Sequence, residues 1–421
     1  MGKFTSMRGV FHVILYLFFL SVPFSPVWSK TIFVGPKSYP QTIRQAIKIA
    51  NGGDTILVSR AHYFEKNLII NKPIALIGIN YPILDGEKKY EVLSIKSSNV
   101  TISGFQIIDS GASSLYDLAA IKIYDSSHVR IVNNKISNAF FGIYVQYGSE
   151  CFIENNLILA KGTEEQASGN GIHCWNSHNL HISNNVISGH RDGIYFEFVK
   201  NSVIKKNRSF QNLRYGLHFM FSNHDTYLKN VFSDNGAGVA VMFSNHVNMY
   251  HNIFQQNWGD ASYGILLKEI SDGEIRYNVF EKNTTGIYLE GVNRLHINQN
   301  KFLHNGWGLK IQASCSDNQI HLNHFIGNTF DVSTNGSLVL NNFDHNYWDK
   351  YEGYDLNKDR IGDVPFRPVS LFSVILERNA TALIMFRSFM AVLLDKTEKM
   401  IPSLTPDLLK DNFPLIRPNV L

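Results

Sequence analysis

Two methionines, Met220 and Met242, are the side chains whose type and spacing best suit metal chemistry, and their separation equals the period of a repeat in the central chain. His218 precedes Met220 by two residues, so in a β-strand the two side chains point to the same face. Thioether and imidazole groups together form a ligand set that suits Cu(I). We therefore predict a transient, solvent-facing Cu(I) site of His218, Met220 and Met242. A core position for both methionines is the alternative, because Met commonly fills gaps in hydrophobic cores.

Two histidines form a second candidate metal pair. His224 and His246 are separated by the same interval, and each ends a Phe-Ser-Asn-His segment. If these segments are turns stacked about 5 Å apart, the two imidazoles are close enough to share a metal ion. The alternative is that each imidazole bonds to local backbone.

A run of oxygen-bearing side chains near the C-terminus resembles the opening of a calcium loop. Asp355, Asn357, Asp359 and Asp363 alternate with other residues, and a hard cation needs several such oxygens converging from a tight turn. However, Arg360 stands where the motif requires Gly, and no Glu follows at the twelfth position. A loop held by Asx turns is therefore the alternative.

The spacing of both pairs belongs to a repeat that fills the central chain. From about residue 120 to 346, a Gly-aliphatic phrase and an Asn-X-apolar phrase recur, mostly at steps of about 22 to 23 residues, and the sequence holds 42 Asn. Apolar residues alternate within each repeat, which is the period of a strand. Short strands separated by Gly and Asn turns predict a right-handed parallel β-helix, an all-β solenoid.

Stacked coils lie about 4.8 Å apart, so equivalent residues of neighbouring coils come one above another. The recurrent Asn residues are then predicted to form ladders at the turns. The residue after each inward aliphatic residue points outward, which defines two outward columns. One column is Tyr144, His173, Tyr195, His218, Ala240, Leu266, Tyr288 and Lys310, and the other is Gln146, Trp175, Glu197, Met220, Met242, Lys268, Glu290 and Gln312. A longer step in the repeat predicts that residues 160–170 bulge from one turn.

The chain divides into five predicted segments. Residues 1–29 combine two basic residues, a short apolar run and a small residue, which is typical of a signal peptide, with a retained N-terminal anchor as the alternative. The others are an N-terminal cap with a helix over 41–50 (30–56), the β-helix (57–346), an Asp-rich loop (347–366) and a helical docking tail (367–421).

The tail carries an apolar stripe. We expect Leu383, Phe386, Met390 and Leu394 to share one helix face, interrupted by Arg387, and a second short helix near 405–410. The stretch is too short to span a bilayer. It therefore suits docking to a partner groove or a membrane surface, or packing back onto the end of the solenoid.

Composition excludes several classes of protein. Lys+Arg 39 against Asp+Glu 35 gives a net charge of only +4, so nucleic acid is not implied. Three scattered cysteines do not form a disulfide scaffold or a paired zinc motif.

At this point the sequence resembles the NosD family. The resemblance rests on Asn346-Tyr-Trp-Asp349, on Asp355 to Asp363 with Ile361-Gly-Asp-Val-Pro365, and on Arg367-Pro-Val-Ser-Leu-Phe372. Arg387-Ser-Phe-Met390, Leu394-Asp395 and Pro402-Ser-Leu-Thr-Pro406 extend it. The repeats alone would match many β-helices, so the tail carries the specificity.

The resemblance implies a periplasmic, non-enzymatic protein of nitrous oxide reductase maturation. It would handle copper, working with an ABC transporter of the NosF ATPase and NosY permease type, with the reductase and with a copper chaperone. The tail would associate with the membrane through the permease.

The rival class is a carbohydrate-active or carbohydrate-binding β-helix, such as a lyase, epimerase or hydrolase. Such enzymes need carboxylates that are close together. The outward columns offer only Glu197 and Glu290, four coils or about 19 Å apart, so we predict no catalytic site. Trp175 and Tyr195 would still allow a sugar to stack.

Overall fold

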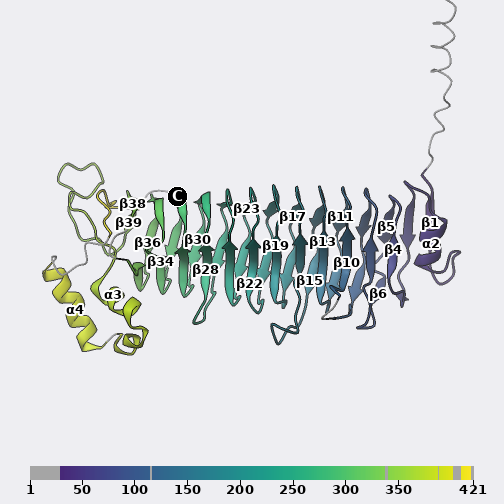
Figure 1. Cartoon of the computed structure of the whole chain (residues 1–421), viewed down its shortest axis with the longest axis horizontal. Coiled ribbons are helices and arrows are strands. Elements are labelled where there is room, and N and C mark those ends of the chain that lie inside the picture. The colour runs from purple at the N-terminus through teal and green to yellow at the C-terminus, as the bar shows by residue number, and fades with distance from the viewer. Residues whose placement is uncertain (1–28, 114–115, 337–339, 387, 402–408, 419–421) are drawn as a thin grey trace, which may run out of the picture.

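Parallel strands stacked coil upon coil make up most of the described chain from residue 31 to 348 (Figure 1). The structure is a computed structural model that describes residues 29–418 except 114–115, 337–339, 387 and 402–408. The predicted signal peptide, apart from residue 29, therefore lies outside the described residues. So does most of the predicted helix at 405–410.

Three parallel sheets of 14, 12 and 13 strands run along the described chain, and we name them sheets 1, 2 and 3. Sheet 1 comprises β1 (Thr31–Val34), β2 (Thr55–Val58), β5 (Ala75–Gly78), β8 (Thr101–Ser103), β11 (Arg130–Val132), β14 (Phe152–Glu154), β17 (His181–Ser183), β20 (Val203–Lys205), β23 (Thr226–Leu228), β26 (Asn248–Tyr250), β29 (Ser271–Arg276), β32 (Asn293–Asn298), β35 (Ser316–His321) and β38 (Leu340–Asp344). Sheet 2 comprises β4 (Leu68–Ile70), β7 (Leu93–Ile95), β10 (Ala119–Tyr124), β13 (Phe141–Gln146), β16 (Ile172–Trp175), β19 (Asp192–Glu197), β22 (Tyr215–Met220), β25 (Ala237–Met242), β28 (Tyr263–Lys268), β31 (Thr285–Glu290), β34 (Trp307–Ile311) and β37 (Phe330–Thr334). Sheet 3 comprises β3 (His62–Tyr63), β6 (Ile83–Asp85), β9 (Gln106–Ile108), β12 (Lys135–Ser137), β15 (Leu157–Leu159), β18 (Val186–Ser188), β21 (Arg208–Phe210), β24 (Val231–Ser233), β27 (Ile253–Gln255), β30 (Val279–Glu281), β33 (Lys301–Leu303), β36 (His324–Ile326) and β39 (Tyr347–Trp348).

The predicted parallel β-helix is thus confirmed. In most of the three-residue strands the central side chain points into the core and the flanking side chains point outward. In β24 and β27, for example, the central residues are Phe232 and Phe254, and both are fully buried. Aromatic rings of successive coils stack on one another inside, from Phe232 through Phe254 to Phe280. This alternation is the sequence pattern that predicted strands. Residues 160–170 contain no strand and form a loop between β15 and β16, as the longer repeat step predicted.

Asparagine ladders hold the turns. In the longest ladder each Asn donates two hydrogen bonds, one from its side-chain Nδ2 and one from its backbone N–H, to Oδ1 of the Asn in the next coil. In the pair Asn230 and Asn252 these bonds measure 3.0 Å from Nδ2 and 2.9 Å from the backbone N–H. Its members are Asn134, Asn156, Asn185, Asn207, Asn230, Asn252, Asn278, Asn300, Asn323 and Asn346. These side chains are buried, so the ladder pairs backbone groups that would otherwise be unsatisfied.

Both ends of the solenoid are covered. Helix α2 (Ile43–Ile49) lies at the N-terminal end, as predicted, and buries Ile43, Ala46 and Ile47 (Figure 1). At the other end the chain folds into α3 (Leu371–Arg378), the 3-10 helix η1 (Ala380–Met385) and α4 (Phe389–Met400). Glu377 of α3 anchors this tail to sheet 2 through Lys310 Nζ at 2.6 Å and Ser333 Oγ at 2.7 Å.

The expectation that Leu383, Phe386, Met390 and Leu394 share the face of one helix is wrong. The chain leaves the helix at Phe386, and Ser388 caps α4 by accepting a bond from the N–H of Ala391. Ser is a favoured N-cap residue, so its position fixes a new helix start. Leu383 and Phe386 consequently lie on one side of a break, and Met390 and Leu394 on the other.

Candidate functional site

The outer face of sheet 2 carries the predicted copper ligands. In β22 the side chains of Leu217 and Phe219 are buried in the core, so those of His218 and Met220 point outward. Met220 pairs directly with Met242 on β25. Both thioether side chains are half-buried on this outer face, which contradicts the alternative that they fill the core.

His218 lies on the same face but does not face solvent, and this part of the prediction is wrong. Its side chain is only 5% exposed, because the ring packs against those of Tyr195 and Tyr215 at centroid distances of 5.0 and 4.8 Å. Arg214 Nη2 lies 3.0 Å from its Nδ1. The other ring nitrogen of His218 is Nε2. This buried Nε2 has no hydrogen-bond partner in the described part of the chain.

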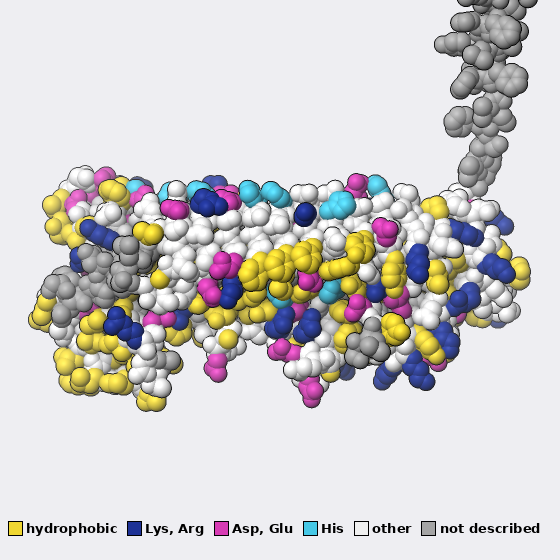
Figure 2. All heavy atoms as spheres, viewed as in Figure 1, with side chains coloured by type: hydrophobic (Ala, Val, Ile, Leu, Met, Phe, Trp, Pro, Cys, Tyr) yellow, Lys and Arg dark blue, Asp and Glu magenta, His cyan; other side chains and the backbone are white. Residues whose placement is uncertain are grey.

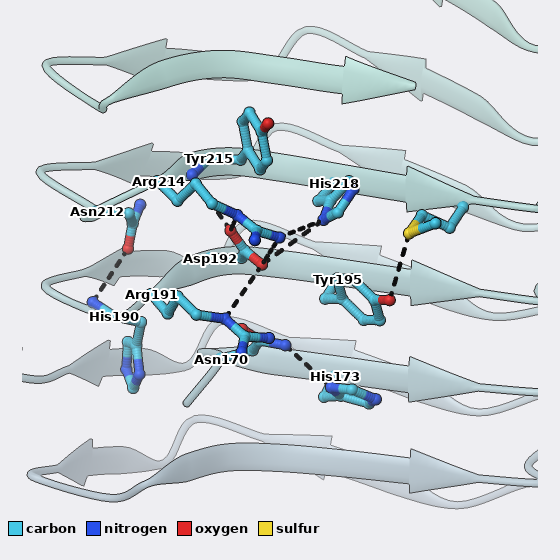
Figure 3. Close-up of polar contacts among 11 residues, drawn as sticks. Asn170, His173, His190, Arg191, Asp192, Tyr195, Asn212, Arg214, Tyr215 and His218 are labelled. Atoms are coloured by element: carbon cyan, nitrogen blue, oxygen red, sulfur yellow. Dashed lines mark hydrogen bonds and ion pairs between the residues drawn. The ribbon is translucent and has the colours of Figure 1, made fainter. Parts of the chain in front are cut away.

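A buried carboxylate explains why His218 is held in place (Figure 3). Asp192, at the start of β19, has a fully buried side chain. Arg214 meets it in a bidentate contact at 3.2 and 3.1 Å, and Arg191 Nε and His218 Nδ1 each lie 3.6 Å from its Oδ2. Burial by itself raises the pKa of Asp192, but the contact with His218 and the charges of the two arginines outweigh burial and hold this pKa below 3.8. We call these four residues the Asp192 cluster.

Sequence reasoning did not find the Asp192 cluster, although the signal was present. Asp192 and Arg214 are separated by one step of the repeat, and Arg191 directly precedes Asp192. Opposite charges at the repeat distance predict an ion pair between adjacent coils. The same rule describes Asp272 and Arg294, whose exposed pair is also bidentate, at 2.7 Å for both contacts.

The outward column of rings continues beyond the cluster. His173 lies between Tyr144 and Tyr195 at centroid distances of 4.4 and 4.8 Å, and Nδ2 of the buried Asn170 is 2.9 Å from its Nδ1. Burial, and then the charge of Arg191, lowers the pKa of His173 to about 3. His173 is therefore neutral at physiological pH and serves as a polar ring in this row.

A second band of rings runs along the edge of the same sheet. Phe198, Phe221 and Phe243 follow the ends of β19, β22 and β25, and their rings stack at 5.2 and 5.1 Å while remaining exposed to solvent. Figure 2 shows a band of hydrophobic side chains along the middle of the solenoid. The methionine pair therefore lies next to an exposed apolar stripe, because Met220 and Met242 directly precede Phe221 and Phe243.

His224 and His246 lie side by side as predicted. Both are exposed turn residues, and their rings stack with centroids 4.6 Å apart and an interplanar angle of 26°. Nδ1 of His246 also lies 3.1 Å from Oδ1 of Asn245, so its local contact is with a side chain and not with the backbone as in the alternative. Nearly parallel imidazoles do not aim their in-plane lone pairs at a common point, so sharing a metal requires one ring to turn. The metal role stays a prediction.

The Asp-rich loop is held by bonds to its own backbone. Asp355 accepts from the N–H groups of Asp359 and Arg360, Asn357 from Asp359, Asp359 from Ile361, and Asp363 from Leu356. The bonds accepted by Asn357 and Asp359 each come from the backbone two residues on, as in the Asx turns of the alternative. Among the residues described, no three His, Cys, Asp or Glu side chains are grouped to hold a metal ion. Calcium binding stays an untested prediction.

The tail presents the apolar side chains that the docking prediction requires. Leu383, Met390 and their neighbours Ile384 and Phe389 are exposed, whereas Phe386 also contacts Phe330 and Phe372. Leu394 is half-buried, and Arg387 lies outside the described residues. None of the described helices has the length and apolar character to cross a membrane.

Glu197 and Glu290 lie four strands apart in sheet 2, as predicted, and Glu290 is 2.8 Å from Lys268 Nζ. At about 4.8 Å per strand they cannot act on one bond.

Comparison with known proteins agrees with this arrangement. A family model described as "Periplasmic copper-binding protein (NosD)" matches residues 157–357, which include the methionine pair, and one described as "Right handed beta helix region" matches residues 31–169. A relative from Pseudomonas aeruginosa, named "Probable ABC transporter binding protein NosD", is 26% identical over 373 residues, covering 83% of this chain and 86% of its own. A relative of the same name from Stutzerimonas stutzeri is 24% identical over 403 residues, covering 84% and 85%.

The chain is a NosD-type protein. The predicted resemblance to the NosD family is confirmed, since both NosD relatives align over most of their length. The relatives of this NosD-type chain are named as binding proteins and not as enzymes.

Solved structures share the fold of this NosD-type chain. A family 28 exopolygalacturonase from Yersinia enterocolitica has a TM-score of 0.58 at 13% identity, covering 75% of this chain and 78% of its own. The A-module of the mannuronan C-5 epimerase AlgE6 from Azotobacter vinelandii has a TM-score of 0.52 at 15% identity, covering 72% and 89%. At such identities the likeness concerns the fold alone.

Proposed function

We propose that this NosD-type protein handles copper in the periplasm, without catalysis, for the maturation of nitrous oxide reductase and together with an ABC transporter. The family description as periplasmic and copper-binding and the relatives' names support this proposal. The observation that carries it is the outward Met220–Met242 pair, within the residues that match the copper-binding family. Residues 1–29 would direct export.

The geometry of the pair suits a transient Cu(I) site. Two soft thioethers on adjacent strands bind Cu(I) in preference to hard cations. The hydroxyl of Tyr195 lies 3.7 Å from Sδ of Met220, so this sulfur has a weak competing partner that copper would displace. His218 joins the site only if the bond between Arg214 and its Nδ1 opens or its Nε2 turns toward the sulfurs, and we therefore assign it a secondary role.

Replacing both methionines by leucine should weaken Cu(I) binding at least tenfold. Leucine keeps the volume and apolar character of each side chain but removes both sulfur donors, so the fold should persist. The measurement is competition with the Cu(I) chelator bicinchoninate, using the mature chain. The matched control is Met390→Leu, a change at an exposed methionine of the tail that should leave the affinity unaltered. Equal Cu(I) affinity of the double variant and the parent chain would refute the site.

We also propose that the tail docks the transporter's permease. The exposed apolar residues of η1 and α4 form a larger apolar patch than the surface of a soluble protein normally carries. Patches of this kind mark interaction sites. The proposal agrees with the names of the relatives, and Figure 2 shows hydrophobic side chains gathered around α4.

Introducing charge at the tail should abolish the association without disturbing the solenoid. Truncation after residue 365 would also remove Asp411, which completes the long Asn ladder, so point substitutions are the cleaner test. We expect Ile384→Glu with Phe389→Glu to eliminate co-purification with the permease, because a buried unpaired carboxylate is costly at an interface. Tyr354→Glu, at an exposed residue of the Asp-rich loop, should retain it. Persistent association of the double variant would exclude docking through this face.

A further inference from the structure

We propose that the outer face of sheet 2 around Arg191 and Arg214 binds an acidic saccharide, independently of copper. The site is the Asp192 cluster together with Asn170 and the neighbouring rings (Figure 3). It extends from the coil of β22, which carries Met220, to the coil of β16 toward the N-terminal end of the same sheet.

The first support is an excess of positive charge. Two guanidinium groups share one carboxylate, that of Asp192, and each arginine side chain keeps about a third of its surface exposed, 32% for Arg191 and 34% for Arg214. Two further carboxylates lie at the rim of this surface. In addition to burial, Glu197 at the other end of β19 raises the pKa of Tyr195, and Glu165 of the exposed loop raises the pKa of Tyr215. Neither carboxylate forms an ion pair with the two arginines in the described part of the chain. A guanidinium has five donors in a planar fork, so both arginines retain donors for a second carboxylate.

The second support is a set of buried polar atoms without partners. Nε2 of His218 and Oδ1 of Asn170 have no hydrogen bond in the described part of the chain, and Nε of Arg191 has only its ion contact with Asp192 at 3.6 Å. The side chain of His218 is only 5% exposed, and Asn170 is fully buried. Buried polar groups are normally paired, so an unpartnered ring nitrogen and an unpartnered amide oxygen beside two arginines indicate a missing polar ligand.

The third support is the aromatic surround. Tyr195 and Tyr215 flank the cluster, and the half-buried Trp175 with the exposed Tyr147 extends the rings toward the N-terminal end. Since strands repeat at about 4.8 Å, a linear ligand along the solenoid axis meets a ring at successive coils. An acidic sugar combines a planar carboxylate, which matches the arginine fork, with an apolar ring face that packs on aromatic side chains.

The insertion loop bounds this surface. Residues 160–170 leave the solenoid between β15 and β16, and the N–H of Gly162 donates to the carbonyl of Gly189 at 2.8 Å, which places the loop beside the coil of Arg191. Insertions in a solenoid commonly lie on its binding face. Figure 2 shows basic side chains beside acidic ones that project from this side of the molecule.

Calorimetric titration of the copper-free mature chain tests the proposal. The ligands are trigalacturonate, neutral maltotriose and inorganic phosphate, each with the parent chain, Arg191→Gln and Arg208→Gln. Arg191 makes only a 3.6 Å ion contact, so Arg191→Gln should fold, and a thermal melt checks this. Arg208 is an exposed arginine on sheet 3 that packs over Phe210 and serves as the matched control.

We expect trigalacturonate to bind and maltotriose not to bind, with Arg191→Gln at least tenfold weaker and Arg208→Gln within twofold of the parent chain. Unchanged affinity in the folded Arg191→Gln chain, or no binding of trigalacturonate at millimolar concentration, would overturn the site. Phosphate binding as tightly as trigalacturonate would overturn the saccharide class. Because copper is absent, these outcomes do not depend on the copper proposal.

Discussion

Replacing Arg214 by Met should lower the free energy of unfolding by about 3 kcal/mol, because it leaves the carboxylate of Asp192 buried without its main partner. The side chain of Asp192 has no exposed surface, and Arg214 supplies both of its short contacts. Arg191 and His218 remain 3.6 Å from the carboxylate of Asp192 and compensate in part for the lost guanidinium. The expected loss of stability therefore lies at the lower end of the range for a broken buried ion pair. Denaturant unfolding of the parent chain and the variant measures the difference.

A second substitution, Asp192→Asn, should restore most of the stability lost in the Arg214→Met chain. The amide carries no charge, so its burial costs far less than that of an unpaired carboxylate. The double-mutant cycle therefore isolates the charge interaction. Arg294→Met is the matched control, since Arg294 and Asp272 form the same bidentate contact between adjacent coils but lie in solvent, where ion pairs contribute little. Equal effects of Arg214→Met and Arg294→Met would contradict the argument from burial.

The pH dependence of stability should report the same cluster. The folded pKa of Asp192 lies below its ordinary value of 3.8, so the unfolded chain takes up this proton first as the pH falls. The stabilisation is complete above about pH 3.8 and is lost as the pH falls toward the folded pKa. Asp192→Asn should flatten this part of the stability profile.

The sequence predicted most of the solenoid because each coil obeys a local rule. Apolar alternation decided which side chains face the core, and the step of the repeat decided which residues become neighbours, as for Met220 and Met242. Both rules depend only on strand geometry. The same rules explain why the predicted outward columns match the strand register from Tyr144 to Lys310.

The features that the sequence did not predict depend on side-chain contacts that follow neither from the repeat nor from strand alternation. Alternation placed His218 on the outer face, but its burial depends on how the Arg214 side chain folds over Asp192 and on two tyrosine rings. The stripe in the tail was misjudged because one capping residue, Ser388, starts a new helix and overrides the apolar spacing. The end of the Asn ladder was missed because its last partner, Asp411, lies 65 residues beyond Asn346.

Asp411 occupies the place of an eleventh ladder residue and closes the solenoid core. Its fully buried carboxylate accepts from the backbone N–H and Nδ2 of Asn346 at 3.0 and 3.1 Å, from Nε1 of the buried Trp348 at 3.0 Å, and from the N–H of Phe413 at 3.1 Å. Burial raises the pKa of Asp411 above 3.8 even though these four donors favour the charged form. The segment after the tail helices is therefore bound to the last coil through one side chain.

Asp411→Ala should destabilise the C-terminal coils by about 3 to 5 kcal/mol, since three buried donors of Asn346 and Trp348 lose their acceptor and each unsatisfied donor costs about 1 to 3 kcal/mol. Asp411→Asn keeps one carbonyl oxygen for these donors and should cost less. Asp355→Ala is the matched control, because Asp355 also accepts two N–H bonds, but these bonds are exposed to solvent and water can replace the lost acceptor.

Hydrogen exchange gives the decisive measurement for Asp411, because each coil of a solenoid contacts mainly its neighbours and the effect should fade with distance. In Asp411→Ala, amides of β36, β38 and β39 should exchange faster, while those of β11 to β20 keep the protection of the parent chain. Uniform loss of protection along all coils would mean that the solenoid unfolds as one unit, and unchanged exchange at β39 would mean that Asp411 does not hold the end of the ladder.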